Sequence, residues 1–83
     1  MSRHIPVESR GWVFRPGKTA EDFVRVTVNG EELSVSRTDS LAEASFARKP
    51  SAILVATICT QFPDAHVTGA YITPQGEVRL IHA

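Results

Sequence analysis

The chain of 83 residues is long enough for one small domain, residues 1–83, and too short for a second hydrophobic core. Apolar residues make up 42% of it and charged residues 22%, a balance that excludes an intrinsically disordered protein. The net charge is zero, and residues 19–47 carry six acidic side chains against two basic ones, which disfavours nucleic-acid binding by that segment.

The N-terminal segment combines positive charge with aromatic residues. Residues 1–18 hold four basic side chains and one acidic side chain, and they lack the apolar stretch of a signal peptide. We expect residues 1–10 to be loosely ordered. Gly11–Arg15 then forms a short strand candidate, ended by Pro16-Gly17, which would add a fifth strand at the edge of a sheet.

Residues 23–36 carry the strongest hairpin signal of the chain. Asn29-Gly30 suits the two central positions of a type I′ turn, where both residues need a positive φ. This turn pairs Val26 with Leu33, so that the large apolar side chains share one face. They are Val24, Val26, Val28, Leu33 and Val35. The hairpin therefore has one apolar face and one polar face.

The segment between the two hairpin signals predicts helix. Ser40-Leu41-Ala42-Glu43 matches a capping box, which predicts a short helix over residues 41–47. Pro50 suits the start of a second helix over Ser51–Phe62, which Pro63 closes. The apolar residues of that segment fall at helical spacing: Leu54, Val55, Ile58 and Phe62. Its β-branched content leaves a buried strand as the alternative.

The second hairpin signal spans residues 70–80. Pro74 suits the first central position of a type I turn, and Gly76 suits the left-handed residue of the bulge that follows. A Pro74-Gln75-Gly76 loop pairs Ile72 with Val78 and places Tyr71 opposite Arg79. Together the elements predict an α+β domain: an antiparallel sheet of two hairpins, open to a fifth N-terminal edge strand, with the helical segment packed on one face.

Residues that could carry chemistry do not gather at a recognisable spacing. The apolar neighbours of Cys59 predict a buried, reduced thiol, which fits a cytoplasmic protein. His66 and His82 fall on one face of the second hairpin, but zinc needs three or four ligands. The serines lie outside any nucleophile motif, and the glycines form no phosphate loop. We therefore expect no enzyme activity, no catalytic residue, no metal and no cofactor.

Two regions indicate binding. The stretch from Arg10 to Arg15 interleaves arginine with Trp12 and Phe14, which is typical of protein hot spots and of single-strand nucleic-acid sites; the alternative is a strand that packs on the core. The polar face of the two hairpins also brings aromatic side chains beside arginines. The candidate partner-binding residues are Arg10, Trp12, Arg15, Phe23, Arg25, Tyr71 and Arg79.

These features favour a non-enzymatic protein-binding module that acts by occupying a surface of its target. The layout, a small domain of two hairpins about a helix, resembles several phage-encoded inhibitors of host defence, anti-CRISPR proteins among them. That resemblance covers the overall arrangement and no matching residues. One alternative is a nucleic-acid-binding accessory protein that uses the basic and aromatic N-terminal strand. Another is a small homodimeric structural protein, and no membrane partner is expected.

Overall fold

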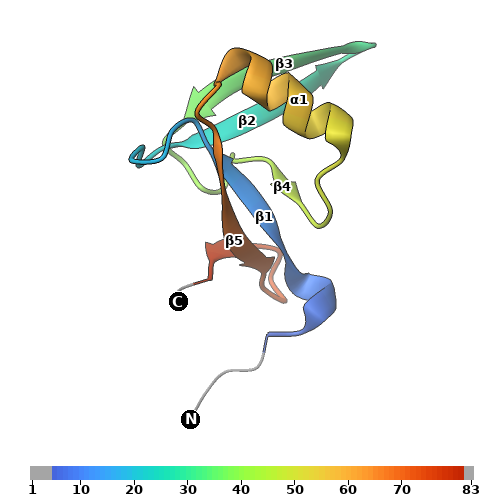
Figure 1. Cartoon of the computed structure of the whole chain (residues 1–83). Helices are drawn as coiled ribbons and strands as arrows, with labels where there is room; N and C mark the ends of the chain where they lie inside the picture. Colours follow the sequence, from blue (N-terminus) through green and yellow to red (C-terminus); the bar gives the residue numbers. More distant parts are fainter. Residues whose placement is uncertain (1–4, 82–83) are drawn as a thin grey trace.

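The computed structural model describes residues 5–81 and has the α+β fold expected from the sequence (Figure 1). Within this range, the strands are β1 (Arg10–Arg15), β2 (Phe23–Asn29), β3 (Glu32–Thr38), β4 (Phe46–Ala47), β5 (His66–Ile72) and β6 (Val78–Leu80). One α-helix, α1 (Ala52–Gln61), lies between β4 and β5, and a single 3-10 turn, η1 (Val7–Ser9), leads into β1. None of these helices has the length and apolarity needed to span a bilayer.

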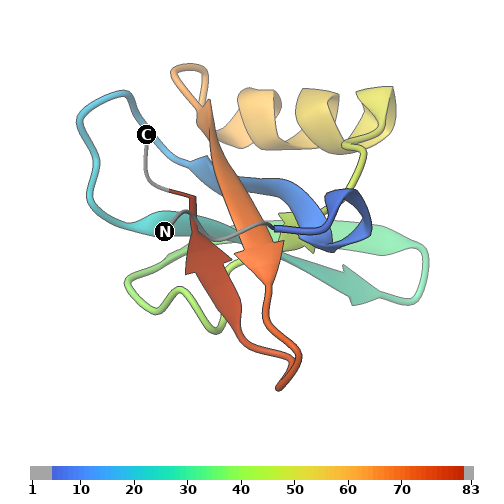
Figure 2. The ribbon, with the colours of Figure 1, turned by 90° about the horizontal axis from the view of Figure 1, so that it is seen from below.

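The two hairpins lie in separate sheets. One sheet has four strands in the order β4-β1-β5-β6, and the other contains only β2 and β3 (Figures 1 and 2). The N-terminal strand is therefore an inner strand and not the edge strand expected from the sequence. Its position follows from its neighbours, because β1 pairs with β5 along its whole length and with β4 on its other side.

Ser45 joins the two sheets. Its backbone N–H donates to the Val24 carbonyl at 3.1 Å. Its hydroxyl accepts from the Val26 N–H at 2.7 Å and lies 3.2 Å from the Val26 carbonyl, to which it donates. Ser45, just before β4, thereby forms hydrogen bonds with backbone groups of β2 and links the four-stranded sheet to the two-stranded sheet.

Replacing Ser45 with alanine is expected to lower the free energy of unfolding by about 1–2 kcal/mol, because the half-buried Val26 N–H loses its acceptor. Urea denaturation measures this loss. Ser36→Ala on β3 removes a hydroxyl from an exposed position and is the matched control, with a change of less than about 0.5 kcal/mol. Equal losses in the two variants would contradict the bridging role of Ser45.

The β2–β3 hairpin keeps its predicted faces but not its predicted turn. Asn29 pairs with Glu32 and Val26 with Val35, so that Gly30 and Glu31 form the loop. Of the described residues other than Gly76, only Gly30 has a positive φ, at 63°, and this pattern is the signature of a type II′ turn. The type I′ prediction is therefore wrong. The pairing is displaced by two residues, which returns each side chain to the same face.

The β5–β6 hairpin matches the prediction. Ile72 pairs with Val78, and Tyr71 lies opposite Arg79. The Gly76 N–H donates to the Thr73 carbonyl at 2.9 Å, which closes the turn, and Gly76 has a φ of 85°. The left-handed conformation at Gly76 agrees with the predicted bulge.

The second predicted helix forms and the first does not. The Ser51 hydroxyl caps α1 by accepting from the Leu54 N–H at 3.1 Å, which confirms helix over the strand alternative. Residues 41–43 form only a turn, and residues 46–47 form β4. The capping-box prediction is wrong because the Glu43 carboxylate accepts from the Thr38 hydroxyl at 3.1 Å instead of reaching back to Ser40.

Two apolar clusters lie on opposite sides of β1, because successive strand residues point to opposite faces. The first contains Val13, Phe23, Ala44 and Ala70. The second contains Phe14, Val24 and Ile58, and α1 covers it. Cys59 is exposed, so the prediction of a buried thiol is wrong. Ile58 occupies the inward position of α1, and the next residue is turned about 100° around the helix.

Candidate binding surface

Half of one face of the four-stranded sheet is left uncovered by α1. Phe14 and Trp12 lie two residues apart on β1 and therefore on the same face. Phe14 is 3% exposed against Ile58 of α1, whereas Trp12 is 42% exposed. In Figure 1, α1 lies near the end of β1 that carries Phe14 and does not extend to the other end of the β1–β5 pair, beside which η1 lies. The uncovered half is the site of the surface described below.

A shallow depression of about 520 Å³ surrounds Trp12 on this half of the sheet. It is lined by Val7, Glu8, Arg10, Gly11, Trp12, Arg48, Lys49, Gly69 and Ile81. Gly69 lies opposite Trp12 on β5 and leaves the floor without a side chain. A Cβ atom at Gly69 would lie 4.0 Å from Trp12 Cζ3 and 3.7 Å from Ile81 Cδ1, so both side chains close over the glycine. The floor and one wall are therefore apolar.

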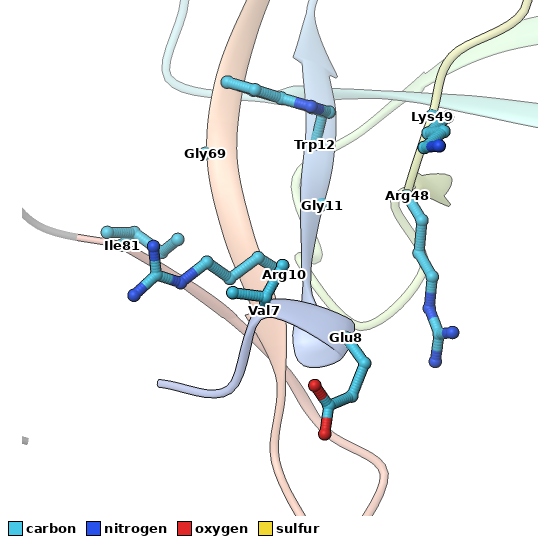
Figure 3. A pocket seen from close by; sticks show the side chains of 9 residues that line it. All are labelled: Val7, Glu8, Arg10, Gly11, Trp12, Arg48, Lys49, Gly69 and Ile81. Atoms are coloured by element: carbon cyan, nitrogen blue, oxygen red, sulfur yellow. The ribbon is translucent and has the colours of Figure 1, made fainter. Parts of the chain in front are cut away.

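Three cations and the carboxylate of Glu8 line the same depression. Arg10 begins β1, and Arg48 and Lys49 follow β4, which pairs with β1 through Trp12 and Ala47. Figure 3 shows Trp12 reaching across β5 at Gly69, with Arg10 directed toward Ile81 and Arg48 on the other side of β1. Within residues 5–81, no carboxylate lies within 4.0 Å of these three cations. We call the residues Val7, Arg10, Trp12, Arg48, Lys49 and Ile81 the Trp12 surface.

Sequence reasoning found Arg10 and Trp12 but missed Arg48 and Lys49. The basic pair lies more than thirty residues away in the chain, between the two helices predicted over residues 41–47 and 51–62. Only the pairing of β4 with β1 brings it to Trp12. The one local signal was a basic dipeptide directly before Pro50.

Tyr71 and Arg79 extend the same sheet face. Arg10 pairs with Tyr71, and Tyr71 pairs with Arg79, so the three side chains form one row across β1, β5 and β6. Arg79 is exposed and donates to the Glu77 carboxylate at 2.9 Å, which neutralises part of its charge. These two residues therefore lie at the margin of the Trp12 surface.

The remaining three candidates lie elsewhere. Arg15 donates from Nη1 to the Ala20 carbonyl at 3.1 Å, and its guanidinium lies 4.7 Å from the centre of the Phe23 ring. Phe23 is 7% exposed within the first apolar cluster, so the expectation that it projects from an outer face is wrong. Arg25 is exposed, but it belongs to β2 in the other sheet.

Among the described residues, the two ionisable groups with a clearly shifted pKa, Asp22 and Arg37, lie outside the Trp12 surface. Arg37 donates from Nε to the Asp22 carboxylate at 2.6 Å, which lowers the pKa of Asp22, and this pair lies on and beside the two-stranded sheet. In the described part of the chain, no three His, Cys, Asp or Glu side chains gather to hold a metal ion. His82, half of the histidine pair considered above, lies outside the described residues.

Comparison with protein-family models, with curated proteins and with solved structures found no match to this chain.

Proposed function

We propose that this protein is a non-enzymatic binding module that docks on a partner protein through the Trp12 surface and acts by occupying the partner's surface. The exposed Trp12, which packs over Gly69 beside Ile81, is the observation that carries this proposal. Tryptophan and arginine are the residues most enriched among interface hot spots, and Arg10 and Arg48 line the same depression as Trp12.

The layout of the surface also suits a protein partner. Protein interfaces place an apolar centre within a polar rim, and here Trp12 and Ile81 share the depression with three cations and one carboxylate, a net positive lining. Charge complementarity calls for acidic residues around the apolar group that enters the depression. A phage-encoded inhibitor of host defence would act in this way, by covering a surface that its target needs. The lone Cys59 suits a reducing, cytoplasmic setting.

Trp12→Ala is expected to weaken binding to the partner about thirtyfold or more, which corresponds to the roughly 2 kcal/mol that defines a hot spot. The partner is recovered from cell extract on the immobilised full chain, and its dissociation constant is then measured by titration calorimetry. Lys49→Glu tests the rim separately, because Lys49 is exposed and its replacement leaves the apolar clusters intact. We expect it to slow association and weaken binding several-fold.

Val67→Ala is the matched control for these variants. Val67 is 44% exposed on the same face of β5 and lies outside the depression. Its replacement should leave the dissociation constant unchanged within about twofold. A partner that binds all four proteins equally would show that the Trp12 surface is not the docking site.

Single-stranded nucleic acid is the second candidate ligand, because Arg48 and Lys49 add to the charge that Arg10 supplies beside an exposed indole. Stacking of a base on Trp12 with phosphates on the cations is the usual chemistry of such sites. Fluorescence anisotropy of a labelled mixed-sequence DNA strand between about 50 and 200 mM salt tests it. Tight binding that falls steeply with salt and is lost in Lys49→Glu would replace the protein-binding proposal.

A further inference from the structure

The strand β3 has a free edge. It is seven residues long and pairs with β2 on one side, and in the described part of the chain no strand pairs with its other side. Its pairing with β2 runs without a bulge from Asn29 and Glu32 to Phe23 and Thr38. β3 contains no proline and no lysine, the residues that commonly block an edge. The free edge is therefore open to another strand.

The backbone groups that face outward follow from the hairpin. In a two-residue hairpin the closing pair, here Asn29 and Glu32, exchanges hydrogen bonds, and the bonded pairs then alternate along the ladder. The N–H and C=O groups of Glu32, Ser34 and Ser36 consequently point toward β2. Those of Leu33, Val35 and Arg37 point away from β2, toward the free edge.

The helix beside this edge has no charge. None of the ten residues of α1, Ala52–Gln61, is charged. Ile53 is 74% exposed and Val55 is 38% exposed, and because these residues lie about 200° apart around the helix, apolar side chains reach solvent on more than one side of α1. An open depression of about 330 Å³ lies between α1 and β3 and is lined by Leu33, Val35, Thr57, Thr60 and Gln61. A helix that is apolar around its circumference is usually covered on more than one side.

We propose that a second copy of this chain pairs with β3 through its own β3, antiparallel and about a two-fold axis at Ser34. The β2–β3 hairpins of the two copies then form one four-stranded sheet (Figure 1 shows one such hairpin with its helix). A two-fold axis perpendicular to a sheet leaves each face on its own side, so both α1 helices lie on the same face. Each strand supplies the backbone partners that the other lacks.

The side chains favour the register with its axis at Ser34 over the register with its axis at Val35. With the axis at Ser34, Leu33 lies opposite Val35 of the second copy, and Glu31 lies opposite Arg37 of the second copy. Each contact occurs twice by symmetry. Moving the axis to Val35 would place Glu31 opposite Asp39 and Leu33 opposite Arg37, which sets like charges together and buries an apolar side chain against a cation. Of these two registers, the one with its axis at Ser34 therefore has the better charge complementarity, since it alone pairs Glu31 with Arg37 of the second copy.

The dimensions agree with this arrangement. A helix is about 10 Å in diameter, and two strand spacings span about 9.6 Å, so two helices fill the space over four strands. The absence of charge on α1 means that the helices approach without like-charge repulsion. Arg37 uses Nε for Asp22 and has its remaining N–H groups for Glu31 of the second copy. The contact between the two α1 helices adds to the area buried by the β3–β3 pair, which makes the dimer interface larger than strand pairing alone would.

The test is crosslinking combined with sedimentation equilibrium of the full chain. At a two-fold axis the two Ser34 Cα atoms lie about 4.5–5.5 Å apart, within disulfide range. We expect Ser34→Cys, in a Cys59→Ser background, to form a disulfide-linked dimer in air. Thr27→Cys is the matched control, because Thr27 pairs with Ser34 on the same face but lies on β2, so that its two copies are about 14 Å apart and stay unlinked.

A charge at the axis provides the second measurement. Ser34→Lys places two ammonium groups directly opposite each other and should raise the dimer dissociation constant roughly tenfold, whereas Thr27→Lys should leave it nearly unchanged. Both positions are exposed, and circular dichroism checks that both variants fold. A wild-type chain that sediments as a monomer at every concentration would overturn the proposal. A dimer that Ser34→Cys fails to link, or that Thr27→Cys links equally well, would overturn it too.

Discussion

Gly11→Ala is expected to lower the free energy of unfolding by about 3 kcal/mol, a large share of the roughly 4 to 12 kcal/mol that stabilises a domain of this size. A Cβ atom at Gly11 would lie 2.7 Å from the Ala47 carbonyl oxygen and 2.8 Å from Phe46 Cε2. The carbonyl belongs to the backbone of β4 and has no rotamer through which to retreat. Either β4 moves away from β1 or the clash remains.

The consequence reaches the Trp12 surface, because β4 carries Arg48 and Lys49 to it. Thermal and urea unfolding measure the stability of Gly11→Ala, and the partner titration measures its affinity. Gly69→Ala is the matched control: it adds the same methyl group at ordinary contact distance from Trp12 and should change stability by less than about 0.5 kcal/mol. Similar stabilities of the two variants would contradict the close approach of β1 and β4.

Ile58→Ala is expected to lower the free energy of unfolding by about 4 kcal/mol. Ile58 is the buried residue of α1 and packs with Phe14 and Val24, one from each sheet. Removing its side chain leaves a cavity between the helix, β1 and β2, because the structure around a deleted core side chain relaxes only partly. Urea denaturation of the full chain measures the loss.

Cys59→Ala is the control for this prediction, since Cys59 is the next residue of α1 and is exposed. Its stability should remain within about 0.5 kcal/mol of the wild-type chain. If Cys59→Ala lowered the free energy of unfolding as much as Ile58→Ala does, α1 would have to be rotated about its axis, with Cys59 facing the sheets, and the prediction would be wrong.

Prediction from the sequence succeeded where the signals are local. Alternation of apolar residues fixed the two faces of the β2–β3 hairpin even though the turn was placed wrongly, because a displacement of two residues preserves alternation. The Pro74-Gln75-Gly76 loop predicted the β5–β6 register correctly, and Ser51 marked the start of α1. The capping box at Ser40 predicted a helix over residues 41–47 that does not form, because the Thr38 hydroxyl, two residues upstream, binds the Glu43 carboxylate instead.

The candidate surface was only partly predictable. Arg10 and Trp12 lie two residues apart on one strand, so their common face followed from the chain alone. Phe23 carried the same local pattern as an exposed aromatic residue, yet it is buried, because Arg15 and the first apolar cluster close over it. Arg48 and Lys49 join Trp12 through the long-range pairing of β4 with β1, which no local pattern encodes.

The amino-acid sequence by itself determined the two hairpins, the start of α1 and the division of the β2–β3 hairpin into an apolar and a polar face, since these depend on turn residues, caps and alternation within a few positions. Only the tertiary structure decided that β1 lies inside the sheet, that Ser45 joins two sheets, and that α1 leaves Trp12 uncovered while covering Phe14. Those outcomes depend on contacts between distant segments, where many pairings satisfy the same local pattern and packing selects one of them.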